Sequence, residues 1–326
     1  MREVIVTGGA GYIGSHIAQE LLDQGLEVHV LDNLQTGFKE FIPKGSIFHH
    51  VDVTNAQELR SAFEALKYPG DAGVIHAAGL KFAGESLKEP IEFYMANTLG
   101  TAQLVKVMAE FKVRNIVFSS SSSVYGSHGS AGPVSEGSTL EPISPYGRSK
   151  LFAEYILNDS KVPLNINSVS LRYFNVIGSR SGCGIDLSIY NLLPNLYRAV
   201  GTEKVIQVFG ENYPTPDGTC IRDYVDVRQL AKAHYSSLRK LSEGKALPAA
   251  INLGSGSGYS VKEIIQVLQN SVGDKIHVEV SAGREGDPAV TLASIDLAKQ
   301  VLDWDPTYSI DESVISGWDC WKAAGN

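Results

Sequence analysis

Tyr146 and Lys150 are the residues whose types and spacing most directly suggest chemistry, in the segment Tyr-Gly-Arg-Ser-Lys. On a helix, residues four apart lie on the same face, one turn from each other. A nearby ammonium favours the phenolate, so we expect Lys150 to lower the pKa of Tyr146 from about 10. Such a phenolate can take a hydroxyl proton while hydride leaves the same carbon. The spacing is also typical of a solvated helix face, but Pro145 favours a helix start here.

A run of five serines, Ser119–Ser123, follows the apolar segment Ile116–Phe118. A hydroxyl beside the phenol can hydrogen-bond to the reacting oxygen and pass on its proton. If the apolar segment is a strand, the run brings hydroxyls to its carboxyl end. The pattern does not say which serine points inward, and a serine-rich loop without chemistry is the alternative.

A glycine-rich turn, Thr7–Gly14, is the second chemical signal, with glycines at 8, 11 and 14. These glycines permit a tight turn, a close approach to a pyrophosphate and close packing of a helix on a strand. The N–H groups of the helix start would face the phosphates. Asp32 ends the next apolar segment, where a carboxylate can bind ribose hydroxyls and repel a 2′-phosphate, so we expect NAD rather than NADP. A structural turn and a capping aspartate are the alternatives.

Short apolar runs alternate with stretches of helical period through the first half of the chain, which predicts βαβ units and a parallel sheet. Ligands bind such sheets at the carboxyl edge of the strands. Asp52-Val53 follows the third run and fits an adenine contact or a plain turn aspartate. The runs expected as strands are Val4–Thr7, Val28–Asp32, Ile47–Val53, Val74–Ala78, Ile116–Phe118 and Ile166–Tyr173.

After about Phe174 this alternation ends, and Gly, Pro and Ser interrupt Gly178–Gly184 and Tyr213–Gly218. The sequence therefore predicts an α/β fold. We expect a doubly wound parallel-sheet Rossmann domain over residues 1–174, which binds NAD and carries the Tyr/Lys pair. A smaller α/β substrate-binding lobe over 175–326 would be interleaved with the first.

Composition excludes several classes of function. The chain has 326 residues, a net charge of −8 and 43% hydrophobic residues, which suits a packed core and argues against nucleic acid or an anionic membrane as partner. The three cysteines form no Cys-x-x-Cys pair and the histidines no i, i+4 pair, so we expect neither disulfides nor a metal. Without a signal-peptide pattern or a membrane-spanning apolar run, we expect a cytoplasmic protein.

Taken together, these motifs resemble the extended short-chain dehydrogenase/reductase family, and in particular its sugar-nucleotide epimerases. The likeness covers nearly the whole chain. It is carried in order by Thr7–Gly14, Asp32–Leu34, His76–Lys81 with Gly84–Ser86, Ser121–Gly126, Ser144–Lys150, Leu171–Asn175, Asp217–Asp226 and Arg284–Asp287.

The resemblance implies an NAD-dependent isomerase that interconverts UDP-galactose and UDP-glucose through a transient 4-keto intermediate, as a homodimer packed through helices near 90–110 and 147–159. It makes Tyr146, Lys150 and Ser121 catalytic. The cofactor residues it implies are Gly8, Gly11, Tyr12, Ile13, Gly14, Asp32, Asn33, Asp52, Val53, Ala77, Ala78, Gly79, Lys81, Asn97, Tyr146, Lys150 and Phe174. The substrate residues it implies are Lys81, Ser121, Ser123, Tyr146, Asn175, Asn191, Leu192, Phe209, Arg222, Arg284 and Asp287.

Two departures from the family pattern bear on the substrate. The tract Gly178–Tyr190 is shorter than usual, and Pro288–Leu292 lacks the bulky aromatic of members with narrow specificity. A roomier pocket would admit N-acetylhexosamines, so a UDP-N-acetylglucosamine 4-epimerase or a dual-specificity enzyme is the alternative. A 4,6-dehydratase would need a carboxylate pair where Ser122 and Ser123 stand. A non-catalytic NAD-sensing protein would tend to lose the Tyr–Lys pair.

Overall fold

A seven-stranded parallel sheet organises the first lobe of the computed structural model, which describes residues 1–126, 132–283 and 288–325. The strand order is β10-β6-β5-β4-β1-β2-β3, so the order reverses between β1 and β4. The fold class predicted from the sequence is confirmed. The strands are β1 (Glu3–Thr7), β2 (Glu27–Asp32), β3 (Ile47–His50), β4 (Ala72–His76), β5 (Asn115–Ser121), β6 (Asn167–Tyr173) and β10 (Ala250–Leu253).

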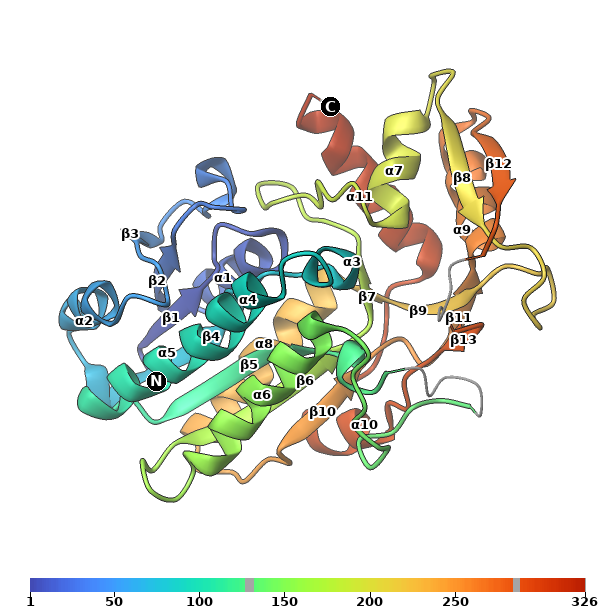
Figure 1. Ribbon diagram of the computed structural model, residues 1–326. Helices are drawn as coiled ribbons and strands as arrows, with labels where there is room; N and C mark the ends of the chain where they lie inside the picture. Colours follow the sequence, from blue (N-terminus) through green and yellow to red (C-terminus); the bar gives the residue numbers. More distant parts are fainter. Residues whose placement is uncertain (127–131, 284–287, 326) are drawn as a thin grey trace.

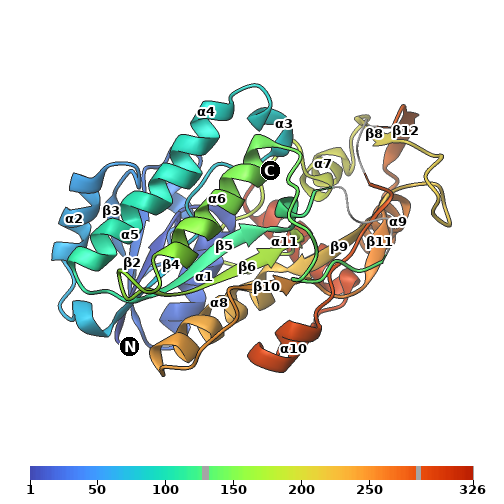
Figure 2. The same ribbon diagram turned by 60° about the horizontal axis from the view of Figure 1, so that its bottom comes forward.

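Helices cover both faces of this sheet (Figures 1 and 2). On one face lie α1 (Tyr12–Asp23), α8 (Val227–Ser242) and α10 (Asp296–Leu302). On the other lie α2 (Ala56–Glu64), α5 (Gly100–Glu110) and α6 (Pro145–Asp159). The chain enters α5 through α3 (Ala83–Ser86), α4 (Pro90–Phe93) and a π-helical segment, Tyr94–Leu99. Short 3₁₀ turns occupy Lys39–Phe41, Pro69–Asp71 and Ser122–Val124.

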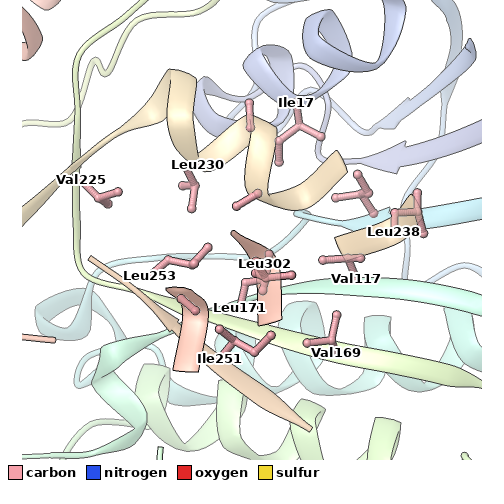
Figure 3. Close-up of a cluster of buried hydrophobic side chains, with 14 of the residues drawn as sticks. Ile17, Val117, Val169, Leu171, Val225, Leu230, Leu238, Ile251, Leu253 and Leu302 are labelled. Atoms are coloured by element: carbon pink, nitrogen blue, oxygen red, sulfur yellow. The ribbon is translucent and has the colours of Figure 1, made fainter. Parts of the chain in front are cut away.

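Each face of the sheet has its own apolar core. On the α1/α8 face, Ile17, Leu230 and Leu302 pack against strand residues such as Val117 and Leu171 (Figure 3). On the opposite face, Leu59, Phe63 and Leu104 cover Ile116 and Phe118. Because both faces are covered, the strands are apolar runs rather than alternating patterns, which is why the sequence revealed them.

The strand bounds differ from the prediction at β5, which was expected to end at Phe118 and continues to Ser121, and at β3, which was expected to reach Val53 and ends at His50. Asp52 explains the early end. Its carboxylate accepts hydrogen bonds from the backbone N–H and hydroxyl of Thr54, at 2.8 and 2.7 Å. This local turn removes the following residues from the ladder.

The second lobe is a smaller layer laid over the carboxyl edge of the sheet (Figure 1). Its central strand β9 (Ile221–Asp226) pairs with β7 (Asn175–Ile177), β11 (Gly258–Ser260) and β13 (Val290–Thr291). A separate ribbon joins β8 (Val205–Phe209) to β12 (His277–Ser281). The helices are α7 (Leu192–Ala199), α9 (Val261–Val272) and α11 (Ile310–Ala323).

The chain returns to the first lobe after entering the second. Helix α8 and strand β10 come from the second half of the sequence, yet both complete the seven-stranded sheet and its core. The carboxyl edge of the sheet is therefore framed by segments from both halves of the chain. Among the described residues, none of the helices is long and apolar enough to cross a membrane.

Candidate active site

Tyr146 stands in the first turn of α6, at the edge of the sheet that faces the second lobe. Ser144 caps this helix, because its hydroxyl accepts a hydrogen bond from the Gly147 N–H at 3.1 Å, and Pro145 is the first helical residue. The predicted helix start is confirmed. The tyrosine ring is half-buried and meets the Phe93 ring edge-on, with centroids 6.2 Å apart.

The serine run, which the sequence left ambiguous, divides its hydroxyls among different partners. Ser119 Oγ lies 3.0 Å from His234 Nε2, and Ser120 donates to Glu154 at 2.5 Å, so both are committed to the buried interior. The Ser121 hydroxyl hydrogen-bonds to the Tyr146 phenol, and its Oγ lies 3.2 Å from Ser123 Oγ. The structure therefore directs Ser121 to the phenol, where the resemblance placed it.

The electrostatics of Tyr146 differ from the prediction. Burial raises the pKa of the phenol above its usual value, and the hydrogen bond from Ser121 only partly opposes this. Lys150 Nζ donates to the Ser119 carbonyl at 3.0 Å and lies over the Phe118 ring, 4.9 Å from its centroid. Burial lowers the pKa of Lys150 to about 8. The expectation that Lys150 lowers the phenol pKa is wrong for this structure, because burial dominates.

The glycine turn forms a cradle that side chains would fill. A Cβ on Gly14 would lie 2.0 Å from the Gly8 carbonyl oxygen, and a Cβ on Gly8, whose φ is +69°, would lie 2.6 Å from the Ala78 backbone N. Gly11 is the N-cap residue of α1 and, having no side chain, makes no capping hydrogen bond to the first N–H groups of the helix. This geometry fits the pyrophosphate of a dinucleotide.

Asp32 joins the glycine turn to the end of β2. Its carboxylate accepts hydrogen bonds from the Ala10 N–H at 3.0 Å and the Leu34 N–H at 2.8 Å. Burial raises the pKa of Asp32, and these two hydrogen bonds oppose the rise. Each carboxylate oxygen keeps a second acceptor site for a ribose hydroxyl.

Asp52, expected as an adenine contact or a plain turn aspartate, is bound to Asn33, another expected cofactor residue, whose Nδ2 donates to Asp52 Oδ2 at 3.0 Å. Burial raises the pKa of Asp52, but hydrogen bonds from Thr54 and Asn33 outweigh it and lower the pKa overall. Val53 is buried. Asp52 is thus a turn aspartate by its contacts, on the same edge as Asp32.

The segment after β4 brings Ala77, Ala78 and Gly79 beside the glycine turn. The Ala77 N–H donates to the Thr7 carbonyl at 3.1 Å and the Ala78 N–H to the Thr7 hydroxyl at 3.3 Å. Asn97 uses its amide within the protein. It accepts from the Leu80 N–H at 2.8 Å and donates to the Leu80 carbonyl and to Ser149. Asn97 therefore ties this loop to α6, a contact that the resemblance did not indicate.

A cavity of about 370 Å³ lies between the two lobes and is lined by Ser121 and Tyr146, whereas Lys150 does not line it. Tyr12 and Ile13, from the start of α1, line it together with residues of both halves of the chain. The expected site residues that it brings together are Tyr12, Ile13, Lys81, Ser121, Ser123, Tyr146, Phe174, Asn175, Asn191 and Leu192.

Two expected substrate residues do not line this cavity. Phe209 lies at the end of β8 and is 39% exposed, and Arg222 lies on β9, where its Nη1 donates to the Ile221 carbonyl at 2.9 Å. Arg284 and Asp287 lie outside the described residues. Of the residues expected at the UDP end of the substrate, the structure thus describes Phe209 and Arg222 only.

Several lining residues have no counterpart in the sequence-based list. Tyr173, Asp186, Tyr197 and Trp321 all line the cavity. Tyr173 is the last residue of the run expected as a strand, so its position at the carboxyl edge was a usable signal. Trp321 comes from α11, far along the chain, and nothing in its local sequence indicated this position.

Comparison with known proteins agrees with this geometry. The model of the NAD dependent epimerase/dehydratase family matches residues 4–254. The chain belongs to this family. Among its members, a UDP-glucose 4-epimerase of Halalkalibacterium halodurans is 39% identical over 325 residues, which cover 98% of this chain and 95% of that relative.

Solved structures of other epimerases have the same fold. A UDP-glucose 4-epimerase from Brucella ovis in complex with NAD superimposes with a TM-score of 0.90 at 37% identity, covering 96% of both chains. The enzyme from Bifidobacterium longum, in complex with NAD+ and UDP, gives a TM-score of 0.89 at 35% identity and covers 99% of both chains.

Proposed function

We propose that this chain is a UDP-glucose 4-epimerase that interconverts UDP-galactose and UDP-glucose with bound NAD. The observation that carries the proposal is the Tyr146 phenol, hydrogen-bonded to Ser121, in a cavity that the start of α1 also lines. The acid/base phenol thus faces the same cavity as the first two residues of the helix that follows the glycine turn. Full-length similarity to epimerases supports the same activity. The N-acetylhexosamine alternative is not favoured by these relatives.

In this proposal Tyr146 takes the proton from the sugar 4-hydroxyl and later returns it. Ser121 is placed to bridge the phenol and the sugar oxygen and to pass the proton between them. Lys150, buried and held at the Ser119 carbonyl, stabilises the strand end that carries Ser121. When bound, NAD supplies the hydride acceptor, and its ring charge favours the phenolate. The 4-keto sugar then turns its other face before reduction, which inverts the carbon.

The cofactor residues divide by their contacts. Gly8, Gly11 and Gly14 form the pyrophosphate cradle, and Asp32 with Asn33 would receive the adenosine ribose. Asp52, Val53, Ala77, Ala78 and Gly79 would border the cofactor between these two parts, and Phe174, which lines the cavity, would lie near its nicotinamide end. We assign residues 1–174, completed by α8 and β10, to NAD binding.

The substrate residues come mainly from residues 175–326. Asn175, Asn191 and Leu192 line the cavity beside Tyr146 and Ser123. Phe209 and Arg222, which do not line the cavity, and Arg284 and Asp287, which lie outside the described residues, would hold the UDP end together with Lys81 at the cavity wall. Bidentate guanidinium groups suit diphosphate oxygens.

The test is to incubate the purified protein with UDP-galactose without added NAD and to resolve the products. Formation of UDP-glucose is expected, since the cofactor must stay bound through the cycle. A parallel incubation with UDP-N-acetylgalactosamine measures whether the pocket accepts the larger sugar. If UDP-galactose stays unchanged even with added NAD, the proposed function is wrong.

We further propose a homodimer that packs through the α4–α5 region and α6. Ile91, Met95, Phe152 and Tyr155 are large apolar or aromatic side chains exposed on these neighbouring segments. Such clustering is typical of interfaces. Light scattering should give twice the mass of one chain, and Phe152→Glu should reduce the measured mass to that of one chain.

Cys183, Cys220 and Cys320 are free thiols, which favours a cytoplasmic location.

A further inference from the structure

Lys81 and Asp186 are the only charged side chains among the described residues that line the cavity, and they face each other. Lys81 Nζ lies 3.4 Å from Asp186 Oδ1. Lys81 follows β4 in the first lobe, whereas Asp186 belongs to the tract Gly178–Tyr190 that departs from the family pattern. The pair therefore spans the two lobes and leaves this part of the cavity without net charge.

Asp186 also holds a second residue of the expected substrate site. Asn191 Nδ2 donates to Asp186 Oδ2 at 2.6 Å, and the Ser188 N–H donates to Oδ1 at 3.2 Å. Asn191 occupies the N-cap position of α7 but makes no side-chain capping bond there. Asparagine is among the preferred capping residues, so its amide is diverted from the helix to this carboxylate.

The two segments that carry Lys81 and Asp186 are braced by further contacts. The Tyr190 hydroxyl donates to Glu85 Oε1 at 2.7 Å, and the rings of Tyr190 and Phe82 lie 4.9 Å apart. Phe82 has φ +88°, a strained conformation for a residue with a bulky side chain. Strain of this kind persists only where the surroundings hold it, and it concentrates at ligand sites.

We propose that Asp186 is a positioning residue of the sugar-nucleotide site, which orients Lys81 and Asn191 and competes with the substrate diphosphate for Lys81. This inference rests on the proposed function. An incoming diphosphate is doubly anionic and is attracted to Lys81, whose present partner is a single carboxylate. The ion pair is long, and the Lys81 side chain is 47% exposed, so it can change partners with little rearrangement. Asp186 then faces the bound diphosphate and favours its release.

The proposal predicts opposite effects on binding and turnover. Asp186→Asn keeps the shape and removes the charge, so the NAD-loaded enzyme should bind UDP about three- to tenfold more tightly, as expected for one partly exposed charge. The KM for UDP-galactose should fall, and kcat should fall too, because Lys81 and Asn191 lose their anchor and release slows. Damage to the fold would instead weaken binding. Asp186→Glu, which keeps the charge, should restore UDP affinity toward the wild-type value.

Titration calorimetry with UDP, together with steady-state kinetics, tests this. In a Lys81→Met background, Asp186→Asn should tighten UDP binding much less than it does in the wild-type background, because the competition for Lys81 is gone and only the repulsion between Asp186 and the diphosphate remains. Asp303→Asn is the control, because it removes a remote surface ion pair in which Asp303 Oδ2 lies 3.1 Å from Lys240 Nζ. It should change neither the Kd for UDP nor the kinetic constants. If Asp186→Asn does not fold, Asp186→Ser replaces it.

Unchanged or weaker UDP binding by the folded Asp186 variant would overturn the proposal, as would an equal effect with and without Lys81. The proposed function fails separately, if the wild-type enzyme binds UDP but does not convert UDP-galactose. In that case the UDP titrations still decide the role of Asp186. A wild-type protein that does not bind UDP would refute both.

Discussion

Glu154→Gln should destabilise the fold by about 3–5 kcal/mol, because it breaks a buried ion pair directly beneath the catalytic serines. Arg172 Nη2 donates to Glu154 Oε2 at 2.6 Å, and its Nε donates to Oε1 at 3.0 Å. The two side chains are only 5% and 4% exposed. Glutamine keeps the size of the side chain but leaves the guanidinium without a counter-charge.

The magnitude follows from how many groups depend on the Glu154 carboxylate. Ser120 also donates to it, at 2.5 Å, and Arg172 reaches on to the Tyr125 hydroxyl at 2.9 Å. Burial alone lowers the pKa of Arg172, but the hydrogen bonds to Glu154 outweigh burial and raise it. The guanidinium therefore stays charged, and a glutamine NH₂ would oppose either Arg172 or Ser120.

The assay is urea unfolding, which gives the free energy of unfolding of Glu154→Gln and of a matched control variant. Glu110→Gln is the control, since Arg60 holds Glu110 with the same two-bond geometry, at 2.7 and 2.9 Å, but at the surface. It should cost only about 0–1 kcal/mol. Equal losses for the two variants, at unchanged m-value, would show that burial does not set the strength of the Arg172 pair.

Three further predictions concern the site. Tyr146→Phe should keep the fold and the bound cofactor but lower kcat by about 10²–10⁴-fold, as measured by product formation from UDP-galactose. Gly14→Ala should release NAD, because its Cβ would lie 2.0 Å from the Gly8 carbonyl oxygen; Gly84→Ala, with open space around it, should retain the cofactor absorbance. Because burial lowers the pKa of Lys150 from 10.5 to about 8, the folded chain loses this proton first. The free energy of unfolding should therefore rise between those pH values relative to Lys150→Met, and parallel profiles would contradict this.

The fold could be predicted because its strands are buried on both faces and its helices are periodic, so each element was visible locally. The return of α8 and β10 to the sheet could not, because strand order depends on packing between distant segments. The core that Leu230 and Ile251 form with Ile17 and Leu171 is the physical reason for that return.

The catalytic group could be found by spacing, whereas its electrostatics could not. The spacing of four positions places Tyr146 and Lys150 on one face of the helix. Only the packed structure shows that Lys150 is directed to the Ser119 carbonyl and that burial raises the pKa of the Tyr146 phenol. Asn97 was expected at the cofactor, which stays a prediction, but its hydrogen bonds to Leu80 and Ser149 were not foreseen. Side-chain direction and desolvation depend on neighbours that the local sequence does not specify.

Transfer of the hydrogen on the sugar C4 is the measurement that tests the central claim most directly. Tyr146 is placed to move the hydroxyl proton, while the C4 hydrogen leaves as hydride and returns to the same carbon. UDP-galactose deuterated at C4, converted in ordinary water, should therefore give UDP-glucose that retains the deuterium at C4, as read by mass spectrometry and NMR. Loss of the deuterium to solvent would mean that C4 is deprotonated rather than oxidised, and would contradict the account.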